Sequence, residues 1–296
     1  MAANTRDIRR RIKSVKNTSQ ITKAMQMVAA AKMRRAQQVA IAGRAYAELL
    51  GQVLRSVAGG AEEGAHELLA AREVKKELVL VISTDKGLCG ALNTNLLREV
   101  AKFDPATTVF VACGRKGVQY IARTNRTMIA EFPLRDAPGF LETKAIAKFC
   151  MDKFVSGEVD KVTVLFTDFI NTLTQIPKAR TILPITSFEV TSGIGGANET
   201  ANVQAAADED SPEYLFEPGM GAVLSAVLPH HVYFQVYQMV LDARASEHSA
   251  RMVAMKSATD NAKQLIKDLT LEYNKVRQAA ITTELLEITT AQMALA

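Results

Sequence analysis

The chain has 296 residues, of which 48% are hydrophobic and 23% are charged. This composition is ordinary for a folded protein and excludes wholesale disorder. Because no apolar run approaches the roughly 20 residues of a membrane-spanning helix, we expect no such span, and we expect no removable leader at the start. The cysteines lack a metal-binding spacing, so we expect buried, reduced thiols at Cys89, Cys113 and Cys150.

The net charge is only +5, but positive charge is concentrated near the N-terminus. Residues 1–43 contain ten Lys and Arg side chains and one acid, Asp7. Such a block indicates either an arm that binds nucleic acid or an anionic membrane, or a basic face that meets an acidic protein partner. The charge alone does not separate these interpretations. The first aromatic residue is Tyr46, so the block lacks the base-stacking side chains of a single-strand binder.

Residues 5 to about 57 form the first predicted helix, with Asn4 or Thr5 as its N-cap. Its apolar and small residues recur in alternating steps of four and three, which is typical of a coiled-coil seam. The predicted seam comprises Ile8, Ile12, Val15, Ser19, Thr22, Gln26, Ala29, Met33, Ala36, Ala40, Gly43, Ala47, Leu50, Leu54 and Val57. The middle of this seam is small and polar, so it buries little apolar surface. We therefore expect residues 1–58 to be a coiled-coil helix that other protein encloses.

The hydrophobic period changes after a glycine-containing stretch at residues 59–64. Continuous apolar runs that predict strands covered on both faces occur at residues 78–82, 108–112 and 162–166. Helical patterns occur at residues 92–103, 116–124 and 141–154. This alternation predicts a mostly parallel sheet, and hence a Rossmann-like α/β base domain over residues 74–190. Residues 182–185 predict a final edge strand, because Pro184 cannot donate to a ladder.

Residues 191–212 are rich in Gly, Ala and acids and have no period, so we expect a flexible loop. The C-terminal segment 213–296 is expected to contain a short helix to Leu228 and a long helix that begins at Pro229. Steps of four and three along the long helix predict a second seam at Leu265, Leu269, Glu272, Val276, Ala279, Thr283, Leu286, Thr290 and Met293.

The two helices with a coiled-coil pattern flank the α/β domain, so the simplest arrangement pairs them antiparallel. The predicted fold class is therefore α/β, with a long antiparallel coiled coil of the N- and C-terminal helices and an inserted Rossmann-like domain. A terminal helix of roughly 65 residues would be on the order of 95 Å long. A helix of that length needs a partner helix and, beyond the partner, a host.

The turn at residues 83–93 lies where an open α/β sheet often binds a ligand. The side chains in this turn that could be catalytic are Asp85, Lys86 and Cys89. However, the turn matches neither the dinucleotide-binding glycine pattern nor a P-loop. We therefore favour a tight turn in which Asn93 or Asn95 caps the next helix.

Residues 113–117 (Cys-Gly-Arg-Lys-Gly) invite a phosphate-binding interpretation, but a strand exit with two exposed cations explains them at least as well. The four histidines lack a zinc-binding spacing, and we expect the pair His230 and His231 at the surface. On these residues alone, a basic coiled-coil nucleic-acid binder and a Rossmann-domain enzyme stay open as alternatives to a helix pair held inside an assembly.

Five segments together resemble one family, the gamma subunits of F-type ATP synthases, and the resemblance covers essentially the whole chain. Near the N-terminus they are Ile8-Arg-Arg-Arg-Ile-Lys-Ser-Val-Lys-Asn-Thr18 and residues 21–34 (Ile-Thr-Lys-Ala-Met-Gln-Met-Val-Ala-Ala-Ala-Lys-Met-Arg). In the α/β region it is Asp85-Lys-Gly-Leu-Cys-Gly-Ala-Leu-Asn93. In the last helix they are residues 245–261 and 273–288, the latter containing Ile-Thr-Thr-Glu-Leu-Leu-Glu.

The resemblance implies a rotor shaft that couples proton-driven rotation to ATP synthesis or hydrolysis and that regulates both ATPase activity and proton flow. Its implied partners are the ring of three alpha and three beta subunits, the epsilon subunit and the c-ring, with one copy of this chain per complex and no nucleic acid. No catalytic residue, cofactor or metal is implied. The implied location is the cytoplasmic face of the bacterial inner membrane, as a peripheral protein that reaches the membrane only through the c-ring.

The resemblance also implies the residues that meet these partners. Met25 matches the segment that meets an acidic loop of the beta subunits. The matches to positions that contact a beta-subunit catch loop or couple the two helices are Arg251, Arg277, Gln278, Thr282 and Glu284. Tyr214 and Glu217 match the base segment that touches the epsilon subunit and the c-ring.

Overall fold

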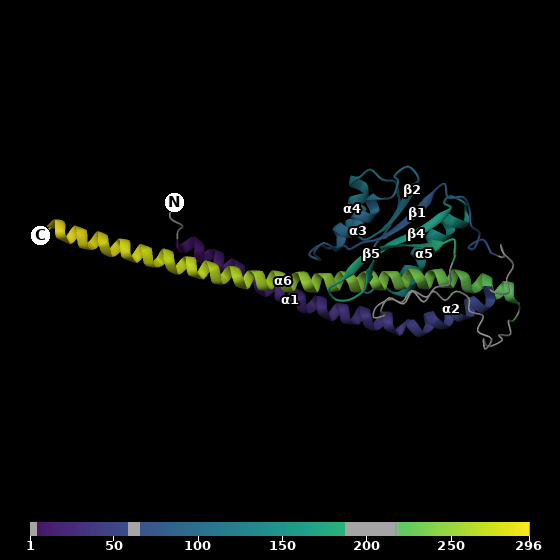
Figure 1. The fold of residues 1–296 in the computed structure, drawn as a ribbon, viewed down its shortest axis with the longest axis horizontal. Coiled ribbons are helices and arrows are strands. Elements are labelled where there is room, and N and C mark those ends of the chain that lie inside the picture. Colours follow the sequence, from purple (N-terminus) through teal and green to yellow (C-terminus); the bar gives the residue numbers. More distant parts are fainter. Residues whose placement is uncertain (1–4, 59–65, 187–216, 218, 296) are drawn as a thin grey trace. The chain divides into compact units, whose positions relative to one another are not determined.

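The computed structural model describes residues 5–58, 66–186, 217 and 219–295 (Figure 1). The chain forms two compact units, one from residues 1–29 and 251–296 and the other from residues 30–250. The helices are α1 (Thr5–Ala42), α2 (Arg44–Ala58), α3 (Leu92–Ala101), α4 (Arg115–Arg123), α5 (Phe140–Val155) and α6 (Met220–Leu295). The strands are β1 (Glu77–Ile82), β2 (Thr108–Cys113), β3 (Met128–Phe132), β4 (Lys161–Phe169) and β5 (Gln175–Leu183). The predicted flexible loop at residues 191–212 lies outside the described residues.

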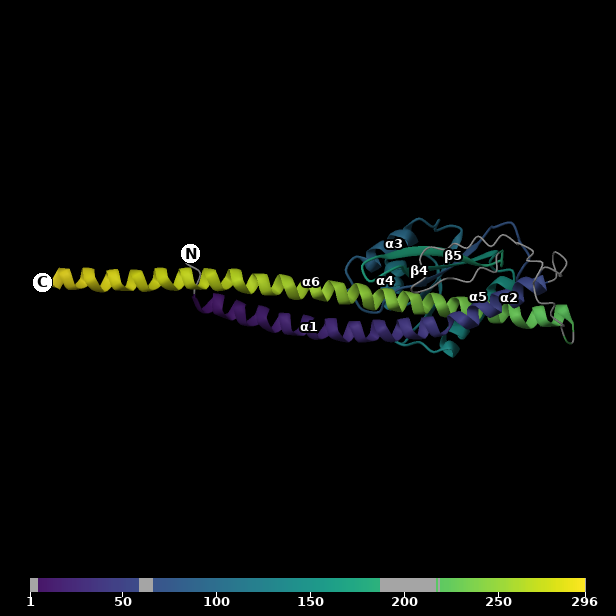
Figure 2. The same ribbon diagram turned by 60° about the horizontal axis from the view of Figure 1, so that its bottom comes forward.

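The first unit is a pair of antiparallel helices, in which the start of α1 lies against α6 (Figure 2). Arg9 donates a hydrogen bond to the hydroxyl of Tyr273, and its guanidinium carbon lies 5.4 Å from the centre of that ring. Further along α1, the Oγ1 atoms of Thr22 and Thr259 are 2.7 Å apart. Residue numbers therefore increase along α1 while those of the facing residues decrease along α6. This confirms the predicted antiparallel coiled coil.

The burial of α1 follows the predicted steps of four and three. Every described position of its predicted seam is buried or half-buried. The prediction of one uninterrupted helix differs at Gly43, where a single turn residue separates α1 from α2. A Cβ added at Gly43 would lie 3.3 Å from the Cζ atom of Phe234, so the small residue permits a close approach to α6.

The predicted seam of α6 is wrong in its phase. The observed seam steps through Met255, Thr259, Ala262, Ile266, Leu269, Tyr273 and Val276. It shares Leu269 and Val276 with the prediction, whereas Leu265 and Glu272 are exposed. Adjacent apolar residues at 265 and 266 permit either phase, and the bond from α1 to the phenol of Tyr273 decides between them.

The predicted seam beyond Val276 is also wrong, because the residues there face no described part of α1. Arg9, close to the described start of α1 at Thr5, already lies opposite Tyr273. Residues 277–294 are accordingly exposed. The predicted seam positions among them are Ala279, Thr283, Leu286, Thr290 and Met293.

The second unit contains a five-stranded sheet in the order β3-β2-β1-β4-β5. β1, β2, β3 and β4 are parallel, and β5 pairs antiparallel with β4. This confirms the predicted, mostly parallel Rossmann-like sheet. The three strands and three helices predicted in this region all form within a few residues of their expected bounds.

The two strands at the edges of the sheet were predicted less well than the central strands. β3 was not predicted, and its side chains are exposed or only half-buried. β5 was expected at residues 182–185, but it starts at Gln175 and is polar and mostly exposed until its last two residues. An edge strand with one solvated face lacks the continuous apolar run that reveals a central strand.

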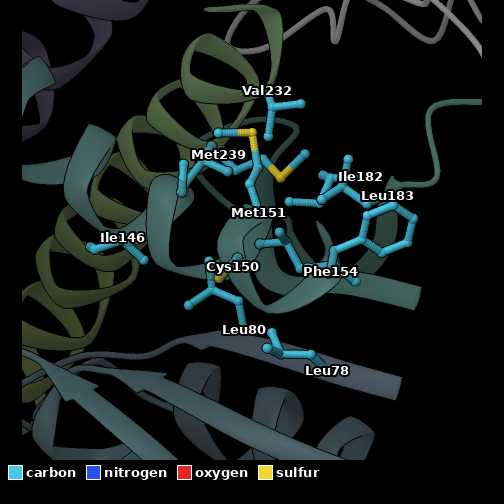
Figure 3. Close-up of a cluster of buried hydrophobic side chains, with 14 of the residues drawn as sticks. Leu78, Leu80, Ile146, Cys150, Met151, Phe154, Ile182, Leu183, Val232 and Met239 are labelled. Carbon is cyan, nitrogen blue, oxygen red and sulfur yellow. The ribbon is translucent and has the colours of Figure 1, made fainter. Parts of the chain in front are cut away.

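The alternation of side chains along β1 divides the core into two layers. Leu78, Leu80 and Ile82 face one cluster that includes buried residues of α5 and α6. Figure 3 shows these side chains converging from β1, α5 and α6. Val79 and Val81 face the opposite cluster, which α3 and α4 complete.

α6 passes through Pro229, although that proline was predicted to begin the helix. A proline inside a helix costs roughly 3 kcal/mol, because it removes one hydrogen bond and crowds the preceding turn. Leu224, Leu228 and Val232 flank the proline and are fully buried. Each such side chain contributes about 1.5–3 kcal/mol on burial, which offsets the cost of the proline.

His231 was predicted at the surface, but it is only 4% exposed. It is buried because the helix continues through Pro229 and turns this position inward. Its Nε2 atom lies 2.9 Å from Nε2 of Gln235. Burial and the nearby charge of Arg180 lower the pKa of His231 to about 4, so the ring is neutral in the folded chain at neutral pH.

Two glycines let the exit of β2 pack against the exit of β1. Gly114 has a φ of 96°, and a Cβ there would lie 2.3 Å from the carbonyl oxygen of Ser83. A Cβ at Gly117 would lie 2.9 Å from Oγ of Ser83. This hydroxyl donates to the carbonyls of Cys113 and Gly114 and accepts from the amide of Gly117. The glycines of residues 113–117 thus serve close backbone packing.

Gly114→Ala should destabilise the chain by about 2 kcal/mol or more, because alanine is strained at this positive φ and its Cβ would clash with the backbone of Ser83. Gly139→Ala is the matched control, since Gly139 has an ordinary φ of −80° and no atom within 4 Å of an added Cβ. Urea unfolding followed by circular dichroism measures both. Equal urea midpoints for the two variants would contradict the role of Gly114 in close backbone packing.

Acid should destabilise the chain through His231. Its pKa is lower in the folded than in the unfolded state, so the stability from the neutral ring is complete above about pH 6.5 and is lost as the pH falls toward about 4. Between about pH 7.5 and about pH 5 the expected loss is on the order of 2 kcal/mol. His231→Phe removes the titration and should flatten that slope. The readout is the difference in free energy of unfolding between the two pH values, and equal slopes in both proteins would refute the account.

Candidate functional site

The basic block near the N-terminus forms an exposed surface of α1. All ten of its Lys and Arg side chains are exposed. Lys32 pairs with Asp136 of the β3–α5 connection, and hydrogen bonding and charge from this lysine lower the pKa of Asp136. Met25 is half-buried among these cations, and its neighbours Met27 and Val28 are exposed. α1 therefore presents methionine and positive charge together.

The C-terminal part of α6 carries four of the predicted contact residues on one exposed stretch. Arg277 and Glu284 lie two turns apart on one stripe of the helix, whereas Gln278 and Thr282 share the adjoining stripe. The hydroxyl of Thr282 donates to the carbonyl of Gln278, 2.9 Å away, so it is satisfied within the helix. Arg277, Gln278 and Glu284 are exposed.

Arg251 is not close to that group. It is half-buried at the opposite end of the α6 segment in this unit, roughly 39 Å along the helix from Arg277. The structure therefore brings together Arg277, Gln278, Thr282 and Glu284 but separates them from Arg251. Glu217 is exposed just ahead of α6, in the second unit, and Tyr214 lies outside the described residues.

The turn after β1 is held by structural hydrogen bonds. Asn93 donates to the hydroxyl of Thr84, 2.8 Å away, and to the sulfur of buried Cys89, 3.3 Å away. The expectation that Asn93 or Asn95 caps α3 is wrong. The N-cap is Ala91, which makes no side-chain cap bond, because Asn93 instead closes the turn on itself.

The three cysteines are buried and form no disulfide with one another, as expected. Burial and the neighbouring Cys150 raise the pKa of the Cys113 thiol far above its usual range, and burial raises the pKa of Cys150 to about 12. Such thiols stay protonated and are poor nucleophiles and metal ligands. Within the described ranges, no three His, Cys, Asp or Glu side chains are grouped so that they could hold a metal ion.

Sequence reasoning missed a polar stretch of α6 at residues 241–249, all nine of which are buried. Arg244 is the centre of this stretch, and it bonds to Glu247, 2.7 Å away, and to the carbonyl of Leu134, 2.9 Å away. A signal was present in the sequence, because polar residues occur here on every side of a helix. Such a helix either faces solvent or lies in a polar network.

In the part of the chain that the structure describes, no helix combines the length and the apolarity needed to cross a bilayer.

A family model described as ATP synthase matches residues 4–295. The chain is 51% identical to the ATP synthase gamma chain of Opitutus terrae and 48% identical to that of Methylacidiphilum infernorum, each over 99% of both chains. A chain of the mitochondrial ATP synthase of Euglena gracilis shares the fold at a TM-score of 0.68 and 20% identity, with 98% of this chain and 94% of that chain covered. The chain therefore belongs to the ATP synthase gamma-chain family, and it is a non-catalytic, central-stalk subunit of that multisubunit enzyme.

Proposed function

We propose that this chain is the rotor shaft of a proton-translocating ATP synthase, in which it couples rotation of a c-ring to ATP synthesis and hydrolysis at the alpha and beta subunits. The observation that carries the proposal is the exposed end of α6. Residues 277–294 form a helix that is exposed throughout. Its exposed large apolar residues are Ile281, Leu285, Leu286, Ile288 and Met293.

A lone helix of this kind is marginal in water, because most helical stability in proteins comes from tertiary packing. An exposed apolar surface of this extent is also typical of a protein–protein contact. Enclosure by a ring of alpha and beta subunits would satisfy both conditions. Arg277, Gln278, Thr282 and Glu284 would then be the polar contacts between the shaft and the beta-subunit catch loop.

The basic surface of α1 supports the second proposed contact. Its ten exposed cations would complement an acidic loop of the beta subunits, with Met25 among them. A shaft of this kind has one copy per ring, so it faces the three beta subunits differently. That asymmetry is how rotation would place the three catalytic sites in different states.

The proposed base contact involves Tyr214 and Glu217, which would meet the epsilon subunit and the c-ring. Glu217 is exposed, as such a contact requires. Through the c-ring the chain would be held at the cytoplasmic face of a bacterial inner membrane. A basic nucleic-acid binder is the less favoured function, because nothing beyond the charge of α1 supports it.

Reconstitution tests the proposal as a whole. When this chain is mixed with purified alpha and beta subunits of the same source, it should join their hexamer in one copy and stimulate ATP hydrolysis. Size-exclusion chromatography and a coupled ATPase assay measure the two effects. A chain that elutes apart from the hexamer and leaves its ATPase rate unchanged would contradict the proposal.

Met25→Lys should impair coupling more than assembly, because it adds a cation to a segment that is already basic and would overstabilise the contact with an acidic loop. We expect several-fold fewer protons pumped per ATP hydrolysed in membrane vesicles. Met25→Leu, which keeps an apolar side chain, is the control and should pump normally. Equal pumping per ATP in wild type and Met25→Lys would count against this role.

Replacing both Tyr214 and Glu217 with alanine should weaken attachment of the complex to the membrane sector, because it removes an aromatic and a charged contact at once. The measurement is the fraction of ATPase activity that stays with washed membrane vesicles. Glu158→Ala, which removes an exposed carboxylate from the α5–β4 connection, is the matched control. Undiminished retention of the double variant would exclude this contact.

A further inference from the structure

The sheet of the second unit has a topological switch point between β1 and β4. The chain leaves β1 through α3 to reach β2 on one side, while β4 lies on the other side of β1. In open α/β sheets, ligands bind at the carboxyl ends of the strands flanking such a point. Here that place is occupied by polar side chains of α6.

Arg244 makes two contacts with this edge of the sheet and one within α6. Its Nη2 atom donates to the carbonyl of Leu134, which follows β3, and lies 3.8 Å from a carboxylate oxygen of Asp85, which follows β1. Its Nη1 atom donates to Glu247, 2.7 Å away on the next turn of α6. The Arg244 side chain is only 3% exposed. Asp85 is itself held by the amide of Arg115.

Two serines extend these contacts to β4. The hydroxyl of Ser246 donates to the carbonyl of Thr167 at the end of β4, 3.0 Å away. The hydroxyl of Ser249 donates to the carbonyl of Thr172, in the turn between β4 and β5, 2.9 Å away. Both serines are fully buried. One short segment of α6 is thus bonded to the ends of three strands or the turns that follow them.

We propose that the position where such sheets bind a ligand holds α6 of this chain instead, and that Arg244 is the positioning residue. Its bonds prevent α6 from rotating about its own axis relative to the sheet. The proposal rests on the rotor function proposed above. Apolar packing alone resists such a rotation weakly, because burial is not directional. Hydrogen bonds weaken steeply with angle, and charge-assisted bonds are the strongest of them.

A rotation of α6 by one residue, about 100°, would separate Arg244, Ser246 and Ser249 from their acceptors together. The three bonds therefore act as one directional constraint. Torque generated at one end of α6 would pass into the sheet without slippage. Occupation of this position by α6 also explains why a Rossmann-like sheet in this chain need not bind a nucleotide.

The test is proton pumping against a load by the assembled complex in vesicles. Arg244→Lys keeps the charge but loses the planar fork, and Arg244→Met keeps only the length. Both should lose pumping several-fold when an opposing proton gradient is imposed, while ATP hydrolysis without a gradient stays near the wild-type rate. Arg135→Met is the control and should pump normally, since it removes a neighbouring arginine that is exposed and pairs with the nearby Glu142.

A second variant separates the constraint from general stability. Ser246→Ala combined with Ser249→Ala removes two bonds to the sheet and leaves every buried charge in place, so it should fold even if the Arg244 variants do not. It should show a smaller loss of the same load-dependent kind. Normal pumping under load by an assembled Arg244→Met complex, or by this double variant, would overturn the proposal. Failure of the wild-type chain to join the alpha–beta hexamer would instead contradict the rotor function.

Discussion

The structure depends on one helix that has to satisfy three kinds of packing. α6 contributes Leu224, Val232 and Val240 to the core beneath the sheet, so its first part is buried on most sides. Its middle part needs only one buried stripe, which faces α1. Its last part, residues 277–294, is exposed throughout the described chain. The apolar content of α6 alone cannot distinguish these three parts, because the helix is continuous while the number of its buried sides changes.

That change explains how much of the fold could be predicted. Central strands such as β1 are buried on both faces and were visible as apolar runs. At the edges, β3 was missed and only the buried end of β5 was predicted. The period of four and three was sufficient for α1, where charged or polar residues flank the first seam positions Ile8, Ile12 and Val15 on both sides. It was insufficient for α6, where Leu265 stands beside Ile266 and the phase depends on the contact between Arg9 and Tyr273.

The candidate site divides in the same way. The exposed positions Arg277, Gln278 and Glu284 came from resemblance to a family, since an exposed polar residue on a helix carries no pattern of its own. The partners proposed for them lie on other chains, so the physical reason for these residues would not be contained in this sequence. The contacts of Arg244 with Asp85 and Leu134 lie wholly within the chain, yet they join residues more than a hundred positions apart. Spacing rules, which act over a few turns, could not find it.

The layered core has a consequence for synthesis of the chain. Leu78 and Leu80 of β1 and Phe154 of α5 lie in one cluster with α6 residues such as Val236 and Met239. A ribosome makes the sheet and α5 first, and α6 only afterwards. The face of the completed sheet that carries Leu78 and Leu80 is therefore only partly covered in the nascent chain until the first turns of α6 emerge. Because exposed apolar strands aggregate readily, the interval between these events is the period in which the chain most needs protection by chaperones.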